Sequence, residues 1–347
     1  MSDTTLHQAP QPPAGWNAYL QRFGYDGFHL RQEWSAVLQQ ALRHEPHFLW
    51  LMREGAIVGA LPLQLVAGPI FGRYLVSQPY LNTGGVLADS PADEARLIEA
   101  AVQLARTLDV KHLELRHERA LAHPAFNALV TEKVHMRLAL PATPELLWEK
   151  GIKSKLRSQI RKPLADESLT VAFGREALLD EFYRVFARNM RDLGTPPYGR
   201  ALFAQMLAQF PAEAEIAVVR HQGQAVAAGF LLHAPGCTLI PSASALREHN
   251  HLSVNLLLYW RVLERSIQRG QPMFDFGRST VDSGTYKFKQ QWGATAHPAY
   301  WQYHSFKGSV GDARPSNGKF ALLVRAWQKL PVWFSSLLGP HIVRGIP

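Results

Sequence analysis

The sequence has a single cysteine, Cys237, in 347 residues. One cysteine excludes an internal disulfide framework and is typical of a protein from a reducing compartment. Cys237 lies in a strand-like apolar run, so we interpret it as a core residue and not as a nucleophile. No run approaches the roughly 18 consecutive apolar residues of a transmembrane helix, and the N-terminus lacks a basic start followed by an apolar core. We therefore expect a cytoplasmic protein that is either soluble or peripheral at the inner membrane.

Common cofactor motifs are also missing. The phosphate-binding patterns GxxxxGK[ST] and GxGxxG do not occur. Of the 15 histidines, the pairs His44/His47 and His249/His251 have no companion cysteine or carboxylate at a recognised metal-ligand spacing. We therefore expect no metal site, and no cofactor is firmly implied.

Positive charge, in contrast, is abundant. The net charge is +9 and the isoelectric point is near 9.7. Such an excess favours an anionic partner, which is a nucleic acid, an anionic lipid surface or a phosphorylated substrate. No tract of lysine and arginine is long enough for a nucleic-acid-binding tail, so we rank nucleic acid last and expect no DNA partner.

Two hairpin patterns indicate that the chain is a duplication. Each has an apolar strand, a polar turn with a glycine, and a second apolar strand, and the glycines are Gly55 and Gly223. A strand, a helix and a further strand follow each hairpin. After the first hairpin we expect a strand at 74–77, a helix that begins at Asp89 or Ser90 with Pro91 in its first turn, and a strand at 110–116. After the second hairpin we expect a strand at 237–242, a helix that is capped by Ser253 and ends at Gly270, and a strand at 273–276.

This order of elements resembles that of acyltransferase (GNAT) units. It implies an α/β fold of tandem GNAT-like (acyl-CoA N-acyltransferase-like) units, each with a central mixed sheet. We divide the chain into a first GNAT-like domain at 1–150, a second at 151–310 that carries the site motif, and an amphipathic tail at 311–347. Coincidence is the alternative, because other α/β proteins share such an order.

The segment 274–293, FDFGRSTVDSGTYKFKQQWG, is the main candidate for a functional site. Phe274 and Phe276 alternate with Asp275 as in a strand, and Gly277 and Gly284 bracket a polar turn before a short helix. Ligands of open α/β sheets bind beyond the carboxyl ends of strands. The candidate side chains there are Asp275, Arg278, Tyr286, Lys287, Phe288 and Lys289. An ordinary solvated turn is the alternative.

Two further segments have candidate substrate contacts. Between the halves, Lys153, Arg157 and Arg161 form a basic row on a helix that Pro163 stops, and no acid lies in 151–164. Without an acid at i,i+4, these side chains favour an external anion such as phosphate, although a solvated face is the alternative. In RNMRDLGTPPYG, glycine and two prolines form a stiff turn that fixes Thr195 and Tyr198, or else simply stops the helix.

The C-terminal tail has a composition of its own. Residues 319–347 mix tryptophan, phenylalanine and leucine with lysine and arginine. This mixture is typical of an interfacial helix on anionic lipid. Packing on the protein's own core or on a partner is the alternative.

Taken together, KSKLRSQIRK, RDLGTPPYG and FDFGRSTVDSGTYKFKQQWG resemble the FemAB-related proteins, in the branch associated with exosortase (PEP-CTERM) exopolysaccharide gene clusters. The resemblance covers nearly the whole chain. It implies a transferase that moves an acyl or aminoacyl group to a phosphorylated or lipid-linked sugar or peptide precursor. In wall-bridge relatives the donor is aminoacyl-tRNA, and a lysine of a Phe-Lys motif, here Phe288-Lys289, assists transfer.

The donor stays open between aminoacyl-tRNA and acyl-CoA. The inserted helical hairpin that contacts tRNA in wall-bridge relatives is absent from this sequence. The loop 242–255 also lacks the Arg/Gln-x-x-Gly-x-Gly/Ala pattern that holds the coenzyme A pyrophosphate at a helix N-terminus.

Acyl transfer passes through a tetrahedral oxyanion, which a fixed cation stabilises. Lys289 is our candidate for that cation, and Asp275 either accepts a proton or braces a basic side chain. Arg278 and the Arg157/Arg161 row are candidates to hold phosphate or carboxylate. The competing hypothesis is a non-catalytic protein of envelope or exopolysaccharide assembly that kept the fold and docks at the membrane surface.

Overall fold

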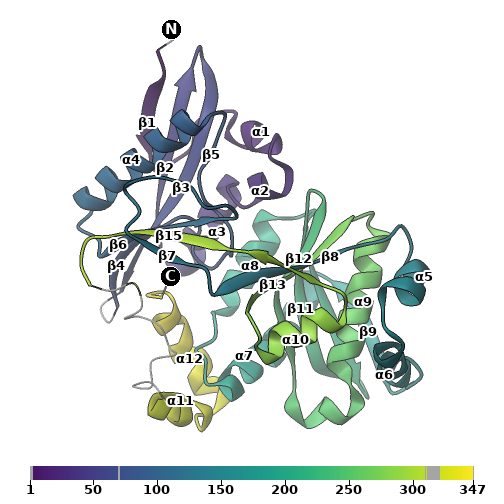
Figure 1. The fold of residues 1–347 in the computed structure, drawn as a ribbon. Coiled ribbons are helices and arrows are strands. Elements are labelled where there is room, and N and C mark those ends of the chain that lie inside the picture. Colours follow the sequence, from purple (N-terminus) through teal and green to yellow (C-terminus); the bar gives the residue numbers. More distant parts are fainter. Residues whose placement is uncertain (1–2, 69–70, 309, 311–320, 347) are drawn as a thin grey trace. The chain divides into compact units, whose positions relative to one another are not determined.

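The computed structural model describes residues 3–68, 71–308, 310 and 321–346. The chain divides into two compact units, coloured by sequence in Figure 1. The first consists of 1–133, 298–320 and 341–347, and the second of 134–297 and 321–340. We describe each unit by itself.

The first unit is built on an eight-stranded mixed sheet. Its strands are β1 (Thr5–Ala9), β2 (Glu45–Arg53), β3 (Ala56–Gly68), β4 (Gly72–Val76), β5 (Leu87–Ala88), β6 (His112–His117), β7 (Ala128–Val130) and β15 (Tyr300–Ser305), and its helices are α1 (Trp16–Gln21), α2 (Gly24–Phe28), α3 (Gln32–Leu42) and α4 (Pro91–Thr107). The order in the sheet is β1-β2-β3-β4-β6-β15-β7, with β5 on β3. Strands β4 and β6 are parallel, and α4 packs on the sheet through an apolar cluster.

Local sequence explains this topology. Glu54 and Gly55 have φ of 51° and 79°, the left-handed pair of a two-residue hairpin turn that joins β2 to β3. Ser90 begins α4, because its hydroxyl accepts a hydrogen bond from the Asp93 amide at 3.1 Å and Pro91 occupies the first turn. Both features confirm the expected hairpin and helix start.

The second unit is built on a seven-stranded mixed sheet of order β14-β8-β13-β12-β11-β10-β9. Its strands are β8 (Lys133–Ala139), β9 (Leu169–Gly174), β10 (Ala214–His221), β11 (Gln224–Ala234), β12 (Cys237–Ala245), β13 (Met273–Thr280) and β14 (Thr295–Pro298). Its helices are α5 (Pro144–Leu146), η1 (Leu147–Gly151, one π-helical turn), α6 (Ser154–Leu164), η2 (Glu176–Leu178), α7 (Leu179–Leu193), α8 (Arg200–Gln209), η3 (Arg247–Leu252), α9 (Val254–Gln268), α10 (Gly284–Gln291), α11 (Ala321–Gln328) and α12 (Val332–Val343), the last of which ends in the first unit.

The turn of the second hairpin repeats that of the first. Gln222 and Gly223 have φ of 51° and 81°, and β12 pairs with β13 in parallel, as β4 does with β6. One detail differs from expectation: Ser253 precedes α9 but has φ of 56°, and its side chain makes no capping hydrogen bond. The hairpin, strand, helix and parallel strand recur in the predicted order, and the predicted fold of two mixed sheets is confirmed.

Helices cover the second sheet on both faces. On one face, α6, α9 and α10 contribute to a single apolar cluster that includes Leu156, Trp260 and Trp292. On the other, α7 and α8 place Phe182 and Phe203 against Phe230 of β11. The predicted site residues therefore fall into two groups, one associated with each face.

The compact units do not divide the chain at residue 150. Residues 134–150 lie in the second unit because β8 joins its sheet, next to β13. After β14 the chain returns to the first unit, where β15 pairs antiparallel with β6. Neither the placement of β8 in the second unit nor that of β15 in the first has a local sequence signal, because pairing between distant strands is a tertiary property.

Candidate functional site

The site motif folds as a strand followed by a capped helix. Strand β13 continues to Thr280, so the expected turn at Gly277 is wrong: Gly277 lies within the strand at φ 76°, which suits glycine. The turn falls at 281–283 instead. The Ser283 hydroxyl accepts a hydrogen bond from the Tyr286 amide at 3.2 Å and so begins α10, the short helix expected there.

Lys289 lies on α10 and is 7% exposed. Its Nζ donates to the main-chain carbonyls of Gly277 and Arg278, each at 3.0 Å. Burial lowers the pKa of Lys289 to about 8, although the Asp275 carboxylate opposes this shift, and the Arg278 guanidinium lowers the pKa further. Near neutral pH, Lys289 is therefore a buried cation with a weakened hold on its proton.

Asp275 is a buried carboxylate in β13 whose two oxygens both accept hydrogen bonds. Oδ2 accepts from Arg137 Nε at 3.1 Å, and Oδ1 from the Gly277 amide at 2.6 Å. The peptide groups of Gly277 thus connect Asp275, through the amide, to Lys289, through the carbonyl. These contacts fit one of the two roles that the sequence left open for Asp275, that of bracing a basic side chain. The other role, accepting a proton, stays a prediction.

Sequence reasoning missed Arg137, which belongs to β8. Its side chain is buried beside Asp275. The strand lies next to the edge of the sheet, and its residues Val134, Met136 and Leu138 belong to the apolar core. A buried arginine in an apolar, alternating strand is a signal of a carboxylate partner. The identity of that partner depends on sheet order, which the sequence does not show.

The other candidates of the motif lie nearby with different surroundings. Phe288 packs edge-on against Tyr259, with ring centroids 5.1 Å apart, and Tyr286 packs partly buried against the same core cluster. Arg278 is half-buried in β13 and acts electrostatically on Lys289. Lys287 is exposed on α10. The aromatic rings thus help to fix α10 on the sheet.

The basic helix has internal partners that were not expected. Arg157 Nη1 donates to the carbonyls of Trp148, Glu149 and Ile152 at 2.8–3.0 Å, which lie in and just after η1. Arg157 therefore does not need the external anion that the absence of a nearby acid predicted, because main-chain carbonyls accept hydrogen bonds from its Nη1. Arg161 lies over the Trp148 ring at 5.8 Å. Lys153 is exposed at the start of α6, which ends one residue after Pro163.

The basic segment begins close to the end of the site motif. A β-carbon added at Gly293 would lie 3.6 Å from the Gly151 carbonyl oxygen. Leu156 and Ile160 of α6 also share an apolar cluster with Trp292. The structure therefore brings these two predicted segments to the same face of the sheet.

Thr195 and Tyr198 belong to the other face. Gly194 ends α7 at φ 76°, and the Thr195 amide donates to the Met190 carbonyl at 2.9 Å, which confirms the predicted helix stop. Tyr198 stacks on Phe186 of α7 with centroids 6.4 Å apart. Thr195 is exposed. None of these contacts connects Thr195 or Tyr198 to Lys289. Their role in substrate binding stays a prediction.

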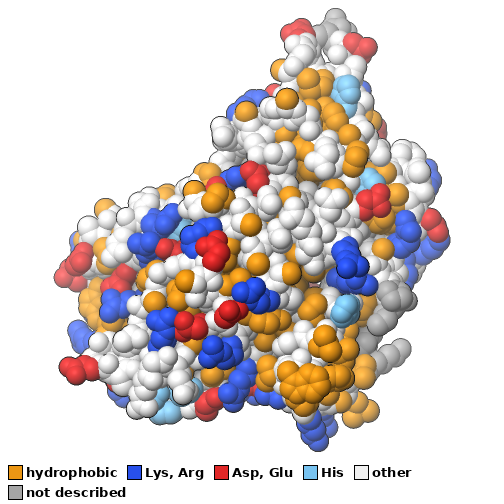
Figure 2. All heavy atoms as spheres, turned by 180° about the vertical axis from the view of Figure 1, so that it is seen from behind, with side chains coloured by type: hydrophobic (Ala, Val, Ile, Leu, Met, Phe, Trp, Pro, Cys, Tyr) orange, Lys and Arg blue, Asp and Glu red, His pale blue; other side chains and the backbone are white. Residues whose placement is uncertain are grey.

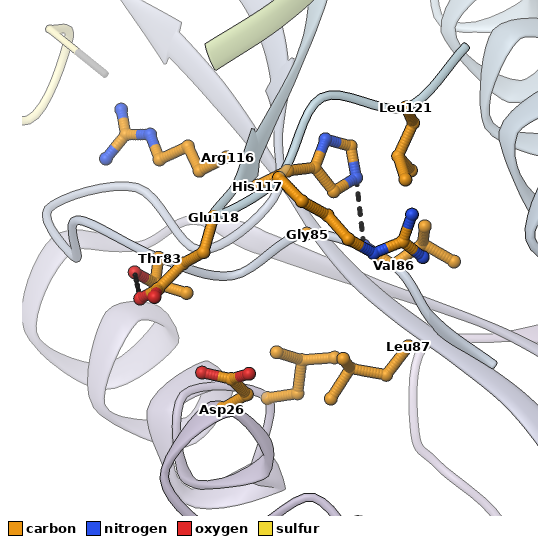
Figure 3. A pocket seen from close by; sticks show the side chains of 11 residues that line it. Asp26, Thr83, Gly85, Val86, Leu87, Arg116, His117, Glu118 and Leu121 are labelled. Carbon is orange, nitrogen blue, oxygen red and sulfur yellow. Dashed lines mark hydrogen bonds between the residues drawn. The ribbon is translucent and has the colours of Figure 1, made fainter. Parts of the chain in front are cut away.

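Two cavities lie away from these residues. In the first unit, a cavity of about 150 Å³ is lined by Thr83, Arg116, His117 and Glu118 among others (Figure 3). Burial lowers the pKa of His117 to about 3, and its Nε2 accepts from the Val86 amide. Arg116 extends to one side, away from Asp26, and pairs with Glu114 at 2.6 Å. Thr83, His117 Nε2 and Arg116 Nε are thus engaged within the fold, whereas Arg116 Nη2 is buried without a hydrogen-bond partner among the described residues.

In the second unit, a cavity of about 220 Å³ lies between the end of α6, β9 and α9. Its lining includes Pro163, Phe173 and Leu257, with Arg261 as the charged member. Strand β9 is at the opposite edge of the sheet from β14 and four strands from β13. Neither cavity is lined by a predicted site residue.

Within the described part of the chain, no cluster of three or more histidine, cysteine, aspartate or glutamate side chains is arranged to hold a metal ion. The described helices include none with both the length and the apolar character needed to cross a bilayer.

Comparison with known proteins supports the predicted fold. Residues 150–290 match the family model of an acetyltransferase (GNAT) domain. No curated protein matches the sequence. The fold is similar to that of FemX (TM-score 0.63, 11% identity, covering 86% of this chain and 97% of FemX).

Two other solved structures have a similar fold. A tandem GNAT protein from the clavulanic acid biosynthesis pathway has a TM-score of 0.58 at 13% identity, covering 88% of this chain and 100% of that one. L-PGS from Bacillus licheniformis has a TM-score of 0.56 at 14% identity, covering 93% and 99%. The site motif falls almost entirely inside the matched range. Residues 150–290 therefore match a GNAT acetyltransferase domain, in a chain whose fold is similar to those of FemX and of a tandem GNAT protein.

Proposed function

We propose that the protein is an acyl or aminoacyl transferase of the FemAB/GNAT type, with Lys289 as the cation that assists transfer. The single observation that carries this proposal is the buried Lys289 ammonium, fixed by two carbonyls at 3.0 Å within the GNAT-matched range. A buried lysine with a pKa near 8 costs folding free energy, which a protein tolerates where the charge serves a function.

The chemistry follows from the position of the charge. Attack of an amine on an acyl carbonyl moves negative charge onto the carbonyl oxygen, and a nearby ammonium stabilises it. The Nζ of Lys289 has three hydrogens, of which the Gly277 and Arg278 carbonyls accept two. The third is the one we assign to the developing oxyanion. Asp275 holds the Gly277 peptide in place, so we assign it a positioning role.

We propose an anionic acceptor, a phosphorylated or lipid-linked sugar or peptide precursor of the cell envelope or of exopolysaccharide. The net charge of +9 supports it, together with the exposed basic residues Lys153 and Arg161 on the same face as α10. Arg278 is the basic side chain nearest in sequence to Gly277, and we assign it to the acceptor's anionic group. Aminoacyl-tRNA and acyl-CoA are both kept as donors.

The test compares two lysines of one helix. Purified wild type, Lys289→Ala and Lys287→Ala are incubated with labelled acetyl-CoA or labelled aminoacyl-tRNA and with nucleotide-linked amino sugars and muropeptides. We expect transfer by wild type and by Lys287→Ala, and a loss of at least about a hundredfold in Lys289→Ala, since a lost oxyanion donor costs that much. Equal rates in the two variants would contradict the role of Lys289, and absence of transfer by the wild type would favour the non-catalytic assembly protein.

A further inference from the structure

Helices α11 and α12 have an apolar surface that faces away from the second unit. Figure 2 shows hydrophobic and basic side chains gathered where these helices lie. The large exposed side chains are Leu322 (78%), Leu323 (63%), Trp333 (71%) and Leu337 (59%). Such a concentration of exposed apolar area on a short segment marks an interaction surface.

The opposite faces of these helices are attached to the second unit. Arg191 Nη1 donates to the Leu330 carbonyl at 2.7 Å, and Gln328 donates to the Asp192 carbonyl at 3.1 Å. A β-carbon added at Gly339 would overlap Pro197, so α12 lies directly on the stiff turn that follows α7. The helices are therefore held in a fixed orientation and are not a loose tail.

The polarity of α12 is inverted relative to an ordinary surface helix. Ser335 is fully buried and Gly339 is buried, four residues apart on the face toward the protein. Trp333 and Leu337, also four residues apart, lie on the exposed face. A helix stabilised only by its own protein would bury the tryptophan and leucine and expose the serine and glycine. The exposed face is thus suited to a second, apolar environment.

Charge identifies that environment. Arg325 and Lys329 are exposed on α11 and just after it, and residues 321–346 contain no aspartate or glutamate. Exposed tryptophan and leucine with flanking basic residues suit the boundary between acyl chains and anionic headgroups. A symmetric contact between two copies through this surface would instead gather Arg325 and Lys329 of both copies in one interface to which 321–346 supplies no acid, and like charges repel there.

We propose that α11 and α12 dock the protein on an anionic bilayer surface, with Trp333, Leu337, Leu322 and Leu323 inserted at the level of the headgroups and Arg325 and Lys329 paired with lipid phosphates. This surface is independent of the transferase site. It would hold the protein beside lipid-linked molecules without any membrane-spanning helix.

The test is co-flotation with vesicles. Wild type, Trp333→Ser/Leu337→Ser and the control Leu129→Ser, which changes a 53% exposed leucine of the first unit, are mixed with vesicles of phosphatidylcholine alone or with phosphatidylglycerol. We expect wild type and control to float with the anionic vesicles, and the double variant to bind at least about tenfold more weakly because two buried apolar side chains are lost. Arg325→Gln/Lys329→Gln should weaken binding to the anionic vesicles by about fivefold per charge removed.

Three outcomes would overturn the proposal. The first is absence of wild-type binding to the anionic vesicles. The second is an equal loss in Leu129→Ser and the double variant. The third is a wild-type dimer in light scattering that becomes monomeric in the double variant, with no vesicle binding, which would assign the surface to a second copy. Thermal melts of each variant check that the fold is kept, and transfer of soluble acceptors by the double variant separates this result from a failure of the proposed function.

Discussion

Gly277 links the two charged side chains of the proposed site. Its amide donates to Asp275 and its carbonyl accepts from Lys289, so a change at either side chain acts on the same residue. Arg137 completes the arrangement by pairing with Asp275 at 3.1 Å. Since Arg137 and Asp275 form a buried ion pair, removal of either one leaves its partner as an uncompensated buried charge that costs several kcal/mol.

The pH dependence of stability tests the burial of Lys289. Its folded pKa is about 8, below the ordinary lysine value of 10.5, so between these values the unfolded chain binds the additional proton. Stability therefore rises with pH across this window, by about 3 kcal/mol in total at 1.36 kcal/mol per pKa unit. We expect urea unfolding of wild type to gain this amount relative to Lys289→Met, because the other groups titrate alike in both proteins. Parallel curves for the two proteins would show that Lys289 is not buried as a cation.

At the scale of elements, short-range patterns were sufficient for much of the fold. The two glycine turns predicted both hairpins, and Ser90 with Pro91 predicted the start of α4, because these depend on a few neighbouring residues. The role of Arg157 could not be predicted in this way. Its partners are carbonyls exposed by one π-helical turn, whose existence no sequence pattern indicated.

Arg157 provides a test at this scale. Arg157→Ala leaves the three carbonyls of Trp148, Glu149 and Ile152 without their donor, and we expect a loss of about 1–3 kcal/mol in the free energy of unfolding. The matched change Lys155→Ala, at an exposed position of the same helix, should fall within about 0.5 kcal/mol of wild type. If the two variants are equally stable and only Arg157→Ala binds an anionic acceptor more weakly, the prediction is wrong and Arg157 contacts the substrate.

At the scale of the whole molecule, pairing between distant strands decides features that neighbouring residues do not predict. The order of elements predicted a duplicated α/β fold with mixed sheets, which the structure confirms. The exchange of β8 and β15 between the units was not predicted, because it depends on pairing across more than a hundred residues. For the same reason Asp275 and Lys289 were found from one continuous motif, whereas Arg137 was not.

The central claim is that protonated Lys289 assists acyl transfer. Its most direct test is the rate of transfer as a function of pH under saturating donor and acceptor. Because the ammonium is present below the pKa of about 8 and lost above it, the account predicts a rate that falls as pH rises through about 8. In Lys289→Met the rate should be at least about a hundredfold lower and lack this limb. A wild-type rate in Lys289→Met, or the same falling limb in that variant, would contradict the account.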